Sequence, residues 1–131
     1  MHLEAIEQQL IQVARQAREH AYAPYSGYTV GAAVLTDDGR IVAGCNVENA
    51  SYGLSVCAER VAVFNAVASG ARHITAAALC TADGGTPCGA CRQVLLEFAA
   101  NPETCTVWVV KPDAIVERYT LTELLPHPFR R

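Results

Sequence analysis

The feature that most constrains the fold is the continuous apolar run at residues 74–81, Ile-Thr-Ala-Ala-Ala-Leu-Cys-Thr. Such a run, without polar alternation, is typical of a central strand covered on both faces of a sheet. The flanking segments 57–70 and 88–100 are predicted to be helices, the first closed by Gly70. Residues 3–20 add a third helix, with apolar side chains at helical spacing. We therefore expect helices on both faces of one sheet.

Four further strands complete the predicted sheet. They span residues 28–35, 40–47, 104–110 and 115–119. The turn Thr-Asp-Asp-Gly joins the first two as an antiparallel hairpin in which Gly39 can adopt positive φ, so the sheet is mixed. Thr120 and Glu123 predict a capping box that opens a short final helix. We expect an α/β chain of one domain, residues 1–131, folded as three α-β-α layers around a mixed five-stranded sheet.

Composition limits the kinds of protein that this chain can be. The stretch Met1-His2-Leu3-Glu4 lacks the basic and apolar pattern of a secretion signal, and no segment has the roughly 20 apolar residues of a membrane span. A cytoplasmic location is the expectation. The net charge is −3 and Lys111 is the single lysine. The basic stripe that a polynucleotide binder uses to neutralise phosphates is therefore missing, and we expect no nucleic-acid partner.

The six cysteines fall into two groups. Three lie within predicted strands, where small buried hydrophobes are expected: Cys45, Cys80 and Cys105. Three lie at predicted helix starts: Cys57, Cys88 and Cys91. A disulfide framework is not expected in a cytoplasmic chain. The second group therefore calls for a different chemistry.

The spacing of Cys57, Cys88 and Cys91 favours a metal site. A lone C-x2-C step is also found in redox dithiols and zinc fingers, but a structural zinc needs a fourth protein ligand, and no ligand-like histidine pair is present. Three protein ligands with an open fourth position are typical of catalytic zinc. Helix N-termini stabilise the thiolates. Three thiolates on one divalent ion leave a net negative charge, which Arg60, and with less support Arg92, can offset.

Glu59 follows Cys57 by two positions, in the first turn of its predicted helix. Side chains there can reach past the helix end, so the carboxylate can lie beside the open metal position without binding the ion. Zinc lowers the pKa of water to about 7, and a nearby carboxylate can take up and pass on the proton. The plainer reading is a glutamate that only favours the helix dipole.

Several spaced motifs resemble one family. They are Cys-Ala-Glu at residues 57–59, Pro-Cys-Gly-Ala-Cys-Arg-Gln at 87–93, Gly-Cys-Asn-Val-Glu-Asn-Ala-Ser-Tyr-Gly at 44–53 and Glu-Leu-Leu-Pro at 123–126. Together, across residues 22–129, they resemble the small homotetrameric zinc-dependent cytidine deaminases. The resemblance implies a cytidine-deaminase-like fold with one zinc ion per subunit. It also implies hydrolytic deamination of cytidine and 2′-deoxycytidine to the uridines and ammonia in pyrimidine salvage, with Glu59 carrying protons to N3 and to the departing ammonia.

The resemblance also implies which residues contact the nucleoside. Asn46 and Glu48 would hold the ribose 3′-hydroxyl, since an amide and a carboxylate can donate to it and accept from it. The alternative is that both bond only the local backbone. Tyr28 stands where the family usually has a phenylalanine that packs on the base; its extra hydroxyl needs a partner if buried, and core packing is its alternative role.

Three further positions are implied to act across subunits. Ala50 and Tyr52 would approach the 5′ side of the sugar from a neighbouring subunit, and Phe129 would close a pocket from another. A frayed C-terminal tail is the alternative for Phe129. The resemblance, and not the residues alone, implies a homotetramer with shared active sites.

Four other functions remain open on sequence grounds. A deaminase of the blasticidin S type shares the zinc motif but departs at residues 46–53. A polynucleotide or tRNA-editing deaminase is disfavoured by charge. A non-catalytic, zinc-stabilised interaction module would leave Glu59 without a role. A thiol–disulfide oxidoreductase using Cys88 and Cys91 would leave both Cys57 and Glu59 unexplained.

Overall fold

The structure is a computed structural model that describes residues 3–131. Met1 and His2, part of the segment predicted to carry no secretion signal, lie outside the described residues. The helices are α1 (Ala5–Ala17), α2 (Ala58–Ala68), α3 (Gly89–Phe98) and α4 (Leu121–Leu124), with 3-10 turns η1 (Arg18–His20) and η2 (Tyr52–Leu54). The strands are β1 (Gly31–Thr36), β2 (Ile41–Cys45), β3 (Ile74–Cys80), β4 (Thr106–Lys111) and β5 (Ala114–Thr120). Within residues 3–131, no helix combines the length and the apolar character that crossing a membrane requires.

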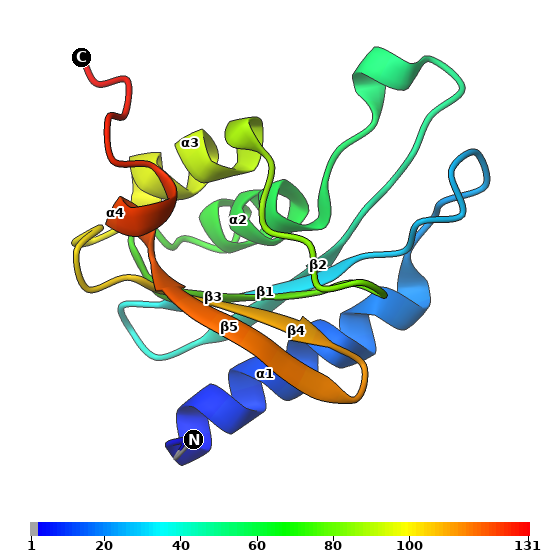
Figure 1. Cartoon of the computed structure of the whole chain (residues 1–131). Helices are drawn as coiled ribbons and strands as arrows, with labels where there is room; N and C mark the ends of the chain where they lie inside the picture. The colour runs from blue at the N-terminus through cyan, green and yellow to red at the C-terminus, as the bar shows by residue number, and fades with distance from the viewer. Residues whose placement is uncertain (1–2) are drawn as a thin grey trace.

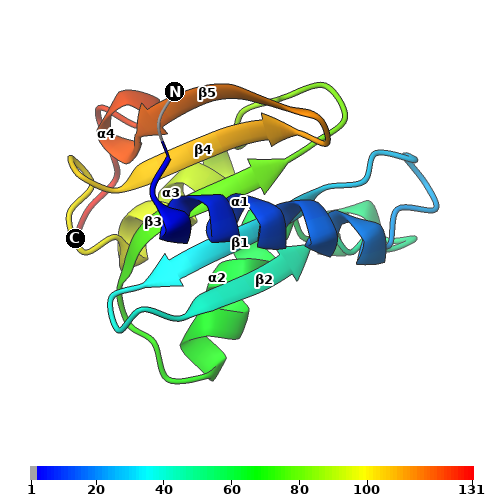
Figure 2. The same ribbon diagram turned by 90° about the horizontal axis from the view of Figure 1, so that it is seen from below.

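The five strands form one mixed sheet in the order β2-β1-β3-β4-β5. β3 and β4 run parallel, and the other neighbouring pairs are antiparallel. Helices α2 and α3 lie side by side on one face of the sheet (Figure 1), and α1 crosses the other face (Figure 2). The predicted three layers, the order of elements and the central position of residues 74–81 are confirmed.

Alternating strand residues build a separate core on each face. Ala32 and Val34 face α2 and α3, whereas the residue between them, Ala33, packs against α1. Trp108 on β4 is fully buried on the α1 side. Two of the three strand cysteines, Cys80 and Cys105, are buried as expected. The third, Cys45 at the end of edge strand β2, is only partly buried, with its sulfur 3.5 Å from the His20 carbonyl oxygen.

Two strand glycines let helices approach the sheet closely on opposite faces. A Cβ atom on Gly31 would lie 2.1 Å from the Ala14 carbonyl oxygen of α1. A Cβ atom on Gly44 would lie 2.3 Å from the Ala62 nitrogen of α2. Both neighbours are backbone atoms, so neither contact can be relieved by a side-chain rotation. These glycines therefore set the distances of α1 and α2 from the sheet.

The first hairpin is shorter than predicted because the Asn46 side chain replaces some of the backbone hydrogen bonds between the two strands. The Asn46 amide oxygen accepts from the Val30 backbone nitrogen at 2.8 Å, and the amide nitrogen donates to the Tyr28 carbonyl oxygen at 2.8 Å. Residues 28–30 thus pair with a side chain, and β1 begins at Gly31. The predicted turn is confirmed, with Gly39 at φ 89°.

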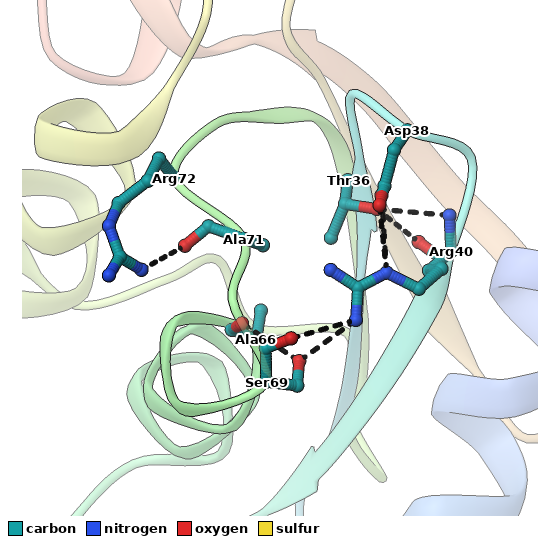
Figure 3. A network of polar contacts seen from close by, with 7 residues as sticks. All are labelled: Thr36, Asp38, Arg40, Ala66, Ser69, Ala71 and Arg72. Carbon is teal, nitrogen blue, oxygen red and sulfur yellow. Dashed lines mark hydrogen bonds and ion pairs between the residues drawn. The ribbon is translucent and has the colours of Figure 1, made fainter.

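A polar network ties the β1–β2 turn to the C-terminal end of α2 (Figure 3). Arg40 pairs with Asp38 at 3.0 Å and donates to the carbonyl oxygen and the hydroxyl of Ser69, each at 3.2 Å. Thr36 donates to the same Asp38 carboxylate. Gly70, at φ 103°, closes the helix as predicted. The far end of α2 is thereby fixed to the hairpin.

We predict that Gly44→Ala destabilises the fold, because the new methyl group must push the backbone of α2 away from β2. The free energy of unfolding should fall by about 2 kcal/mol or more, measured by urea denaturation. Gly53→Ala is the matched control, since a Cβ atom there meets nothing within 4 Å. Equal stabilities of the two variants would contradict the close-approach argument.

Candidate metal centre and adjoining cavity

Three cysteine sulfurs meet where α2 and α3 begin. Cys57 is the N-cap residue of α2, Cys88 is the N-cap residue of α3, and Cys91 lies in the first turn of α3. The Cys57 and Cys88 sulfurs are 3.9 Å apart, and those of Cys88 and Cys91 are 3.3 Å apart. The N-termini of the two helices lie close together above the sheet (Figure 1).

The cluster fits a zinc ion. All three sulfurs lie within 4.8 Å of one another. Tetrahedral zinc with sulfur ligands at about 2.3 Å places its sulfurs about 3.8 Å apart, and the observed separations bracket that value. Soft thiolate donors suit zinc better than magnesium or calcium. Among the described residues, these three can act as ligands, which would leave one position of a tetrahedral ion for a group from outside the protein.

The charge of the cluster is partly balanced by Arg60. The pKa of the Cys57 thiol is lowered to about 5, because Cys91 hydrogen-bonds its sulfur and Arg60 lies close by. An Arg60 terminal nitrogen donates to the Cys57 sulfur at 3.6 Å, as expected of a charge-balancing group. The same hydrogen bond with Cys57 raises the pKa of the Cys91 thiol. Of the two thiols, Cys57 is therefore the one that loses its proton more easily.

Arg92 does not take part in this balance, contrary to the sequence-based hypothesis. Its guanidinium donates to the Pro87 and Leu124 carbonyl oxygens, each at 2.7 Å, and to the Thr86 hydroxyl at 3.1 Å. Arg92 instead fastens the loop before Cys88 to the end of α4. It supports the ligand through the backbone.

Glu59 lies in the first turn of α2, next to the sulfur cluster. Its side chain is only 6% exposed, although a glutamate at this position is ordinarily solvated. Burial raises the pKa of its carboxyl, and the negative charge of the Cys57 thiolate adds to the effect. A carboxyl with a raised pKa gains and loses a proton closer to neutral pH, which suits a general acid and base.

A cavity of about 330 Å³ opens beside the cluster. This volume is within the range of small-molecule sites. Its lining combines apolar walls with a few polar groups. The lining residues are Ser26, Tyr28, Val30, Asn46, Glu48, Ser55, Val56, Cys57, Ala58, Glu59, Leu79, Thr81, Gly85, Thr86 and Cys88. Six of the predicted site residues thus share one cavity: Tyr28, Asn46, Glu48, Cys57, Glu59 and Cys88.

Asn46 and Glu48 hold the local backbone and also face the cavity. Asn46 is 8% exposed, and its two bonds to residues 28 and 30 leave one amide hydrogen uncommitted. One Glu48 oxygen accepts from the Tyr25 and Ser26 backbone nitrogens at 3.0 and 3.1 Å. The Ser26 hydroxyl donates to the other oxygen. The predicted alternative of local backbone bonding therefore coexists with a place in the cavity wall.

Tyr28 is 40% exposed, so the alternative role in core packing is wrong, yet its hydroxyl has a hydrogen-bond partner. The hydroxyl donates to the Asp83 carboxylate at 2.7 Å. Sequence analysis missed Asp83 and the buried Thr81, whose hydroxyl donates to Asp83 at 3.2 Å. Thr81 is the last residue of the predicted strand 74–81 and Asp83 lies in the loop after it, and only this position at the end of a strand pointed to them.

Ala50, Tyr52 and Phe129 lie outside the cavity of their own chain. Ala50 and Tyr52 belong to the segment between β2 and α2, which projects from the body of the fold (Figure 1). Tyr52 is 76% exposed and Phe129 is 66% exposed. The backbone of Phe129 is held by the Gln93 side chain, at 2.9 and 3.3 Å. The tail near Phe129 is therefore anchored to α3.

The chain has clear relatives. Residues 4–107 match the cytidine and deoxycytidylate deaminase zinc-binding region. A cytidine deaminase of Halalkalibacterium halodurans is 47% identical over 124 residues, which cover 93% of this chain and 92% of the relative. That of Sporosarcina psychrophila is 44% identical over 126 residues, covering 95% and 91%. The crystal structure of the Burkholderia pseudomallei cytidine deaminase superposes with a TM-score of 0.86 at 47% identity, covering 93% of this chain and 98% of that one.

We predict that Arg60→Gln weakens metal binding, because the Cys57 thiolate loses a charged donor. Zinc affinity should fall about 10- to 100-fold, measured by competition with a chromophoric chelator. Arg72→Gln is the matched control, since Arg72 donates only to backbone carbonyls near the far end of α2 in the described structure. Unchanged affinity in Arg60→Gln would refute the charge-balancing role.

Proposed function

The chain belongs to the cytidine and deoxycytidylate deaminase family, and we propose that it hydrolyses cytidine and 2′-deoxycytidine to uridine and 2′-deoxyuridine with release of ammonia. One observation carries the proposal: three converging thiols and a buried carboxyl adjoin a single cavity. The named relatives, aligned over nearly their whole length, are cytidine deaminases, which supports cytidine as a substrate. The reaction is a step of pyrimidine salvage.

Cys57, Cys88 and Cys91 would hold the zinc ion. Bound there, zinc supplies a Lewis acid that lowers the pKa of a water molecule to near 7. Arg60 offsets the excess negative charge of three thiolates. The helix N-termini at Cys57 and Cys88 contribute further positive potential at the sulfurs. Both contributions favour the thiolate form in which sulfur binds a metal ion.

Glu59 moves the protons of the reaction. The attacking water must lose both of its protons: one goes to N3 of the pyrimidine, and the other to the amino group that leaves as ammonia. The oxygen becomes the 4-oxo group of uridine as the C4–nitrogen bond breaks. A carboxyl with a raised pKa can accept each proton and release it again, so one residue serves both transfers.

The cavity wall recognises the nucleoside. Asn46 has an uncommitted amide hydrogen, and the Glu48 carboxylate has lone pairs beyond its three bonds, so together they can bind the ribose 3′-hydroxyl. A site built this way rejects analogues that lack the hydroxyl. Tyr28, with Val30 and Leu79 nearby in the wall, offers the flat apolar surface for the base.

We further propose a homotetramer with shared active sites. Tyr52 and Phe129 are among the most exposed large hydrophobic side chains of the described residues, so both are available to a neighbouring subunit. Ala50 and Tyr52 would approach the sugar of one neighbour, and Phe129 would close the cavity of another. The anchored backbone at Phe129 supports this role, since it presents the ring from a fixed position.

The proposal extends to the whole chain and to its location. The family match ends at residue 107, but β4 and β5 continue the same sheet to Thr120, which supports one deaminase domain over residues 1–131. The Cys88 and Cys91 sulfurs, 3.3 Å apart, can form a disulfide unless the surroundings are reducing or a metal ion binds them. A reducing compartment, the cytoplasm, suits this site.

We predict that the zinc-loaded protein converts cytidine to uridine, followed by the loss of cytidine absorbance, and that Glu59→Gln lowers kcat by about two orders of magnitude or more while zinc stays bound. The amide cannot shuttle protons but keeps the shape of the carboxyl. Glu97→Gln, on an exposed part of α3, is the control and should match wild type.

Two outcomes would contradict the function. Turnover of blasticidin S without turnover of cytidine would assign the chain to the other deaminase group. Equal activity of wild type and Glu59→Gln, including none in either, would favour a zinc-stabilised module without catalysis.

We also predict that sedimentation velocity finds the active protein at four times the mass of one chain. Phe129→Ala should keep that mass but lower kcat/KM about three- to tenfold, because an aromatic wall of the neighbouring cavity is lost. Full activity in a species with the mass of a single chain would refute shared sites.

A further inference from the structure

A hydrogen bond joins two walls of the cavity that come from distant parts of the chain. Tyr28 precedes β1, and Asp83 lies in the loop between β3 and α3. The Tyr28 hydroxyl donates to an Asp83 carboxylate oxygen at 2.7 Å. Tyr28 is 40% exposed, so packing covers only part of its side chain. The bond to Asp83 therefore helps to fix the position of the ring.

The loop on the other side is organised around the same carboxylate oxygen. That oxygen also accepts from the Thr81 hydroxyl and from the Gly85 backbone nitrogen, each at 3.2 Å. The Thr81 hydroxyl in turn accepts from the backbone nitrogens of Gly84 and Gly85, at 2.7 and 3.0 Å. Thr81 and Gly85 line the cavity. Asp83 thus connects the aromatic wall to the folded loop.

The charge state keeps this bond in one direction. Donation from Tyr28 holds the pKa of Asp83 below its ordinary value, so the carboxylate is ionised at neutral pH. Burial raises the pKa of Tyr28, and the neighbouring carboxylate adds to the effect, so the hydroxyl keeps its proton. A neutral donor thus meets a charged acceptor, a pairing stronger than a neutral one.

We propose that Asp83 is a positioning residue for nucleoside binding, acting through the Tyr28 hydroxyl to hold the ring and residues 81–86 in place before substrate enters. The inference rests on the proposed function, because it concerns the nucleoside cavity. A wall already in place does not have to be ordered when ligand binds, and this lowers the cost of binding. The bond contacts no reacting atom, so its loss should act on KM and leave kcat nearly unchanged.

The test is a double-mutant cycle with Tyr28→Phe, Asp83→Ala and the double variant, all zinc-loaded. Each single variant should raise the KM for cytidine about three- to tenfold with kcat within about twofold. The double variant should be no worse than Asp83→Ala, because the two changes break the same bond. Multiplicative effects in the double variant, or an unchanged KM in either single variant, would overturn the proposal.

Conservative and matched variants separate positioning from folding. Asp83→Asn keeps an acceptor oxygen for Tyr28 and should restore KM to within about threefold of wild type; failure to do so overturns the proposal. Tyr119→Phe on β5 and Asp113→Asn in the exposed β4–β5 turn are controls for the same chemical changes elsewhere. Both should leave KM unchanged, and a rise equal to that of the cavity variants would count against a specific role.

The proposed function and the positioning role of Asp83 can be refuted separately. Wild-type protein that carries zinc and releases no ammonia from cytidine would refute the proposed function, and the positioning role with it. Normal wild-type turnover with unaltered KM in Tyr28→Phe and Asp83→Ala would refute the positioning role alone.

Discussion

The meeting of two helix N-termini at one point is the constraint on which the rest of the structure depends. Cys57 and Cys88 are themselves the N-cap residues, so their sulfurs are placed by backbone geometry. α2 is held at its distance by Gly44 and α3 packs beside it, both against one face of the sheet. A shift of either helix would separate the sulfurs, so the geometry of the metal centre depends on the packing of the layered core.

The same convergence explains why a buried glutamate is tolerated. Burying a carboxylate away from compensating charge is costly, yet Glu59 lies on the first turn of a helix, where the dipole favours negative charge, and Arg60 adds a guanidinium next to the cluster. The site thus accumulates opposing charges in a small volume. This arrangement sacrifices some stability for a carboxyl whose pKa lies above its ordinary value.

Sequence patterns were sufficient for the order of helices and strands, because apolar periodicity reports which face is buried. They placed Arg60 correctly, since positions 57 and 60 adjoin on a helix, but misplaced Arg92, whose direction depends on the distant carbonyl of Leu124. The late start of β1 at Gly31, three residues after the predicted start, and the role of Asp83 were not predicted, because each depends on a contact with a residue distant in the sequence.

The glycine contacts have a consequence for engineering. Exchanging glycine for alanine is a common route to thermostable enzymes, because it restricts the unfolded chain. Gly31 and Gly44 cannot be exchanged in this way, because a Cβ atom at either position would collide with the backbone of a helix. Neither glycine has a positive φ, so backbone dihedral angles alone would not identify the problem. Gly89, beside the ligand Cys88, has open space where a methyl group would go. A glycine-to-alanine exchange is therefore better tolerated at Gly89, next to the sulfur cluster, than at Gly31 or Gly44 within the sheet.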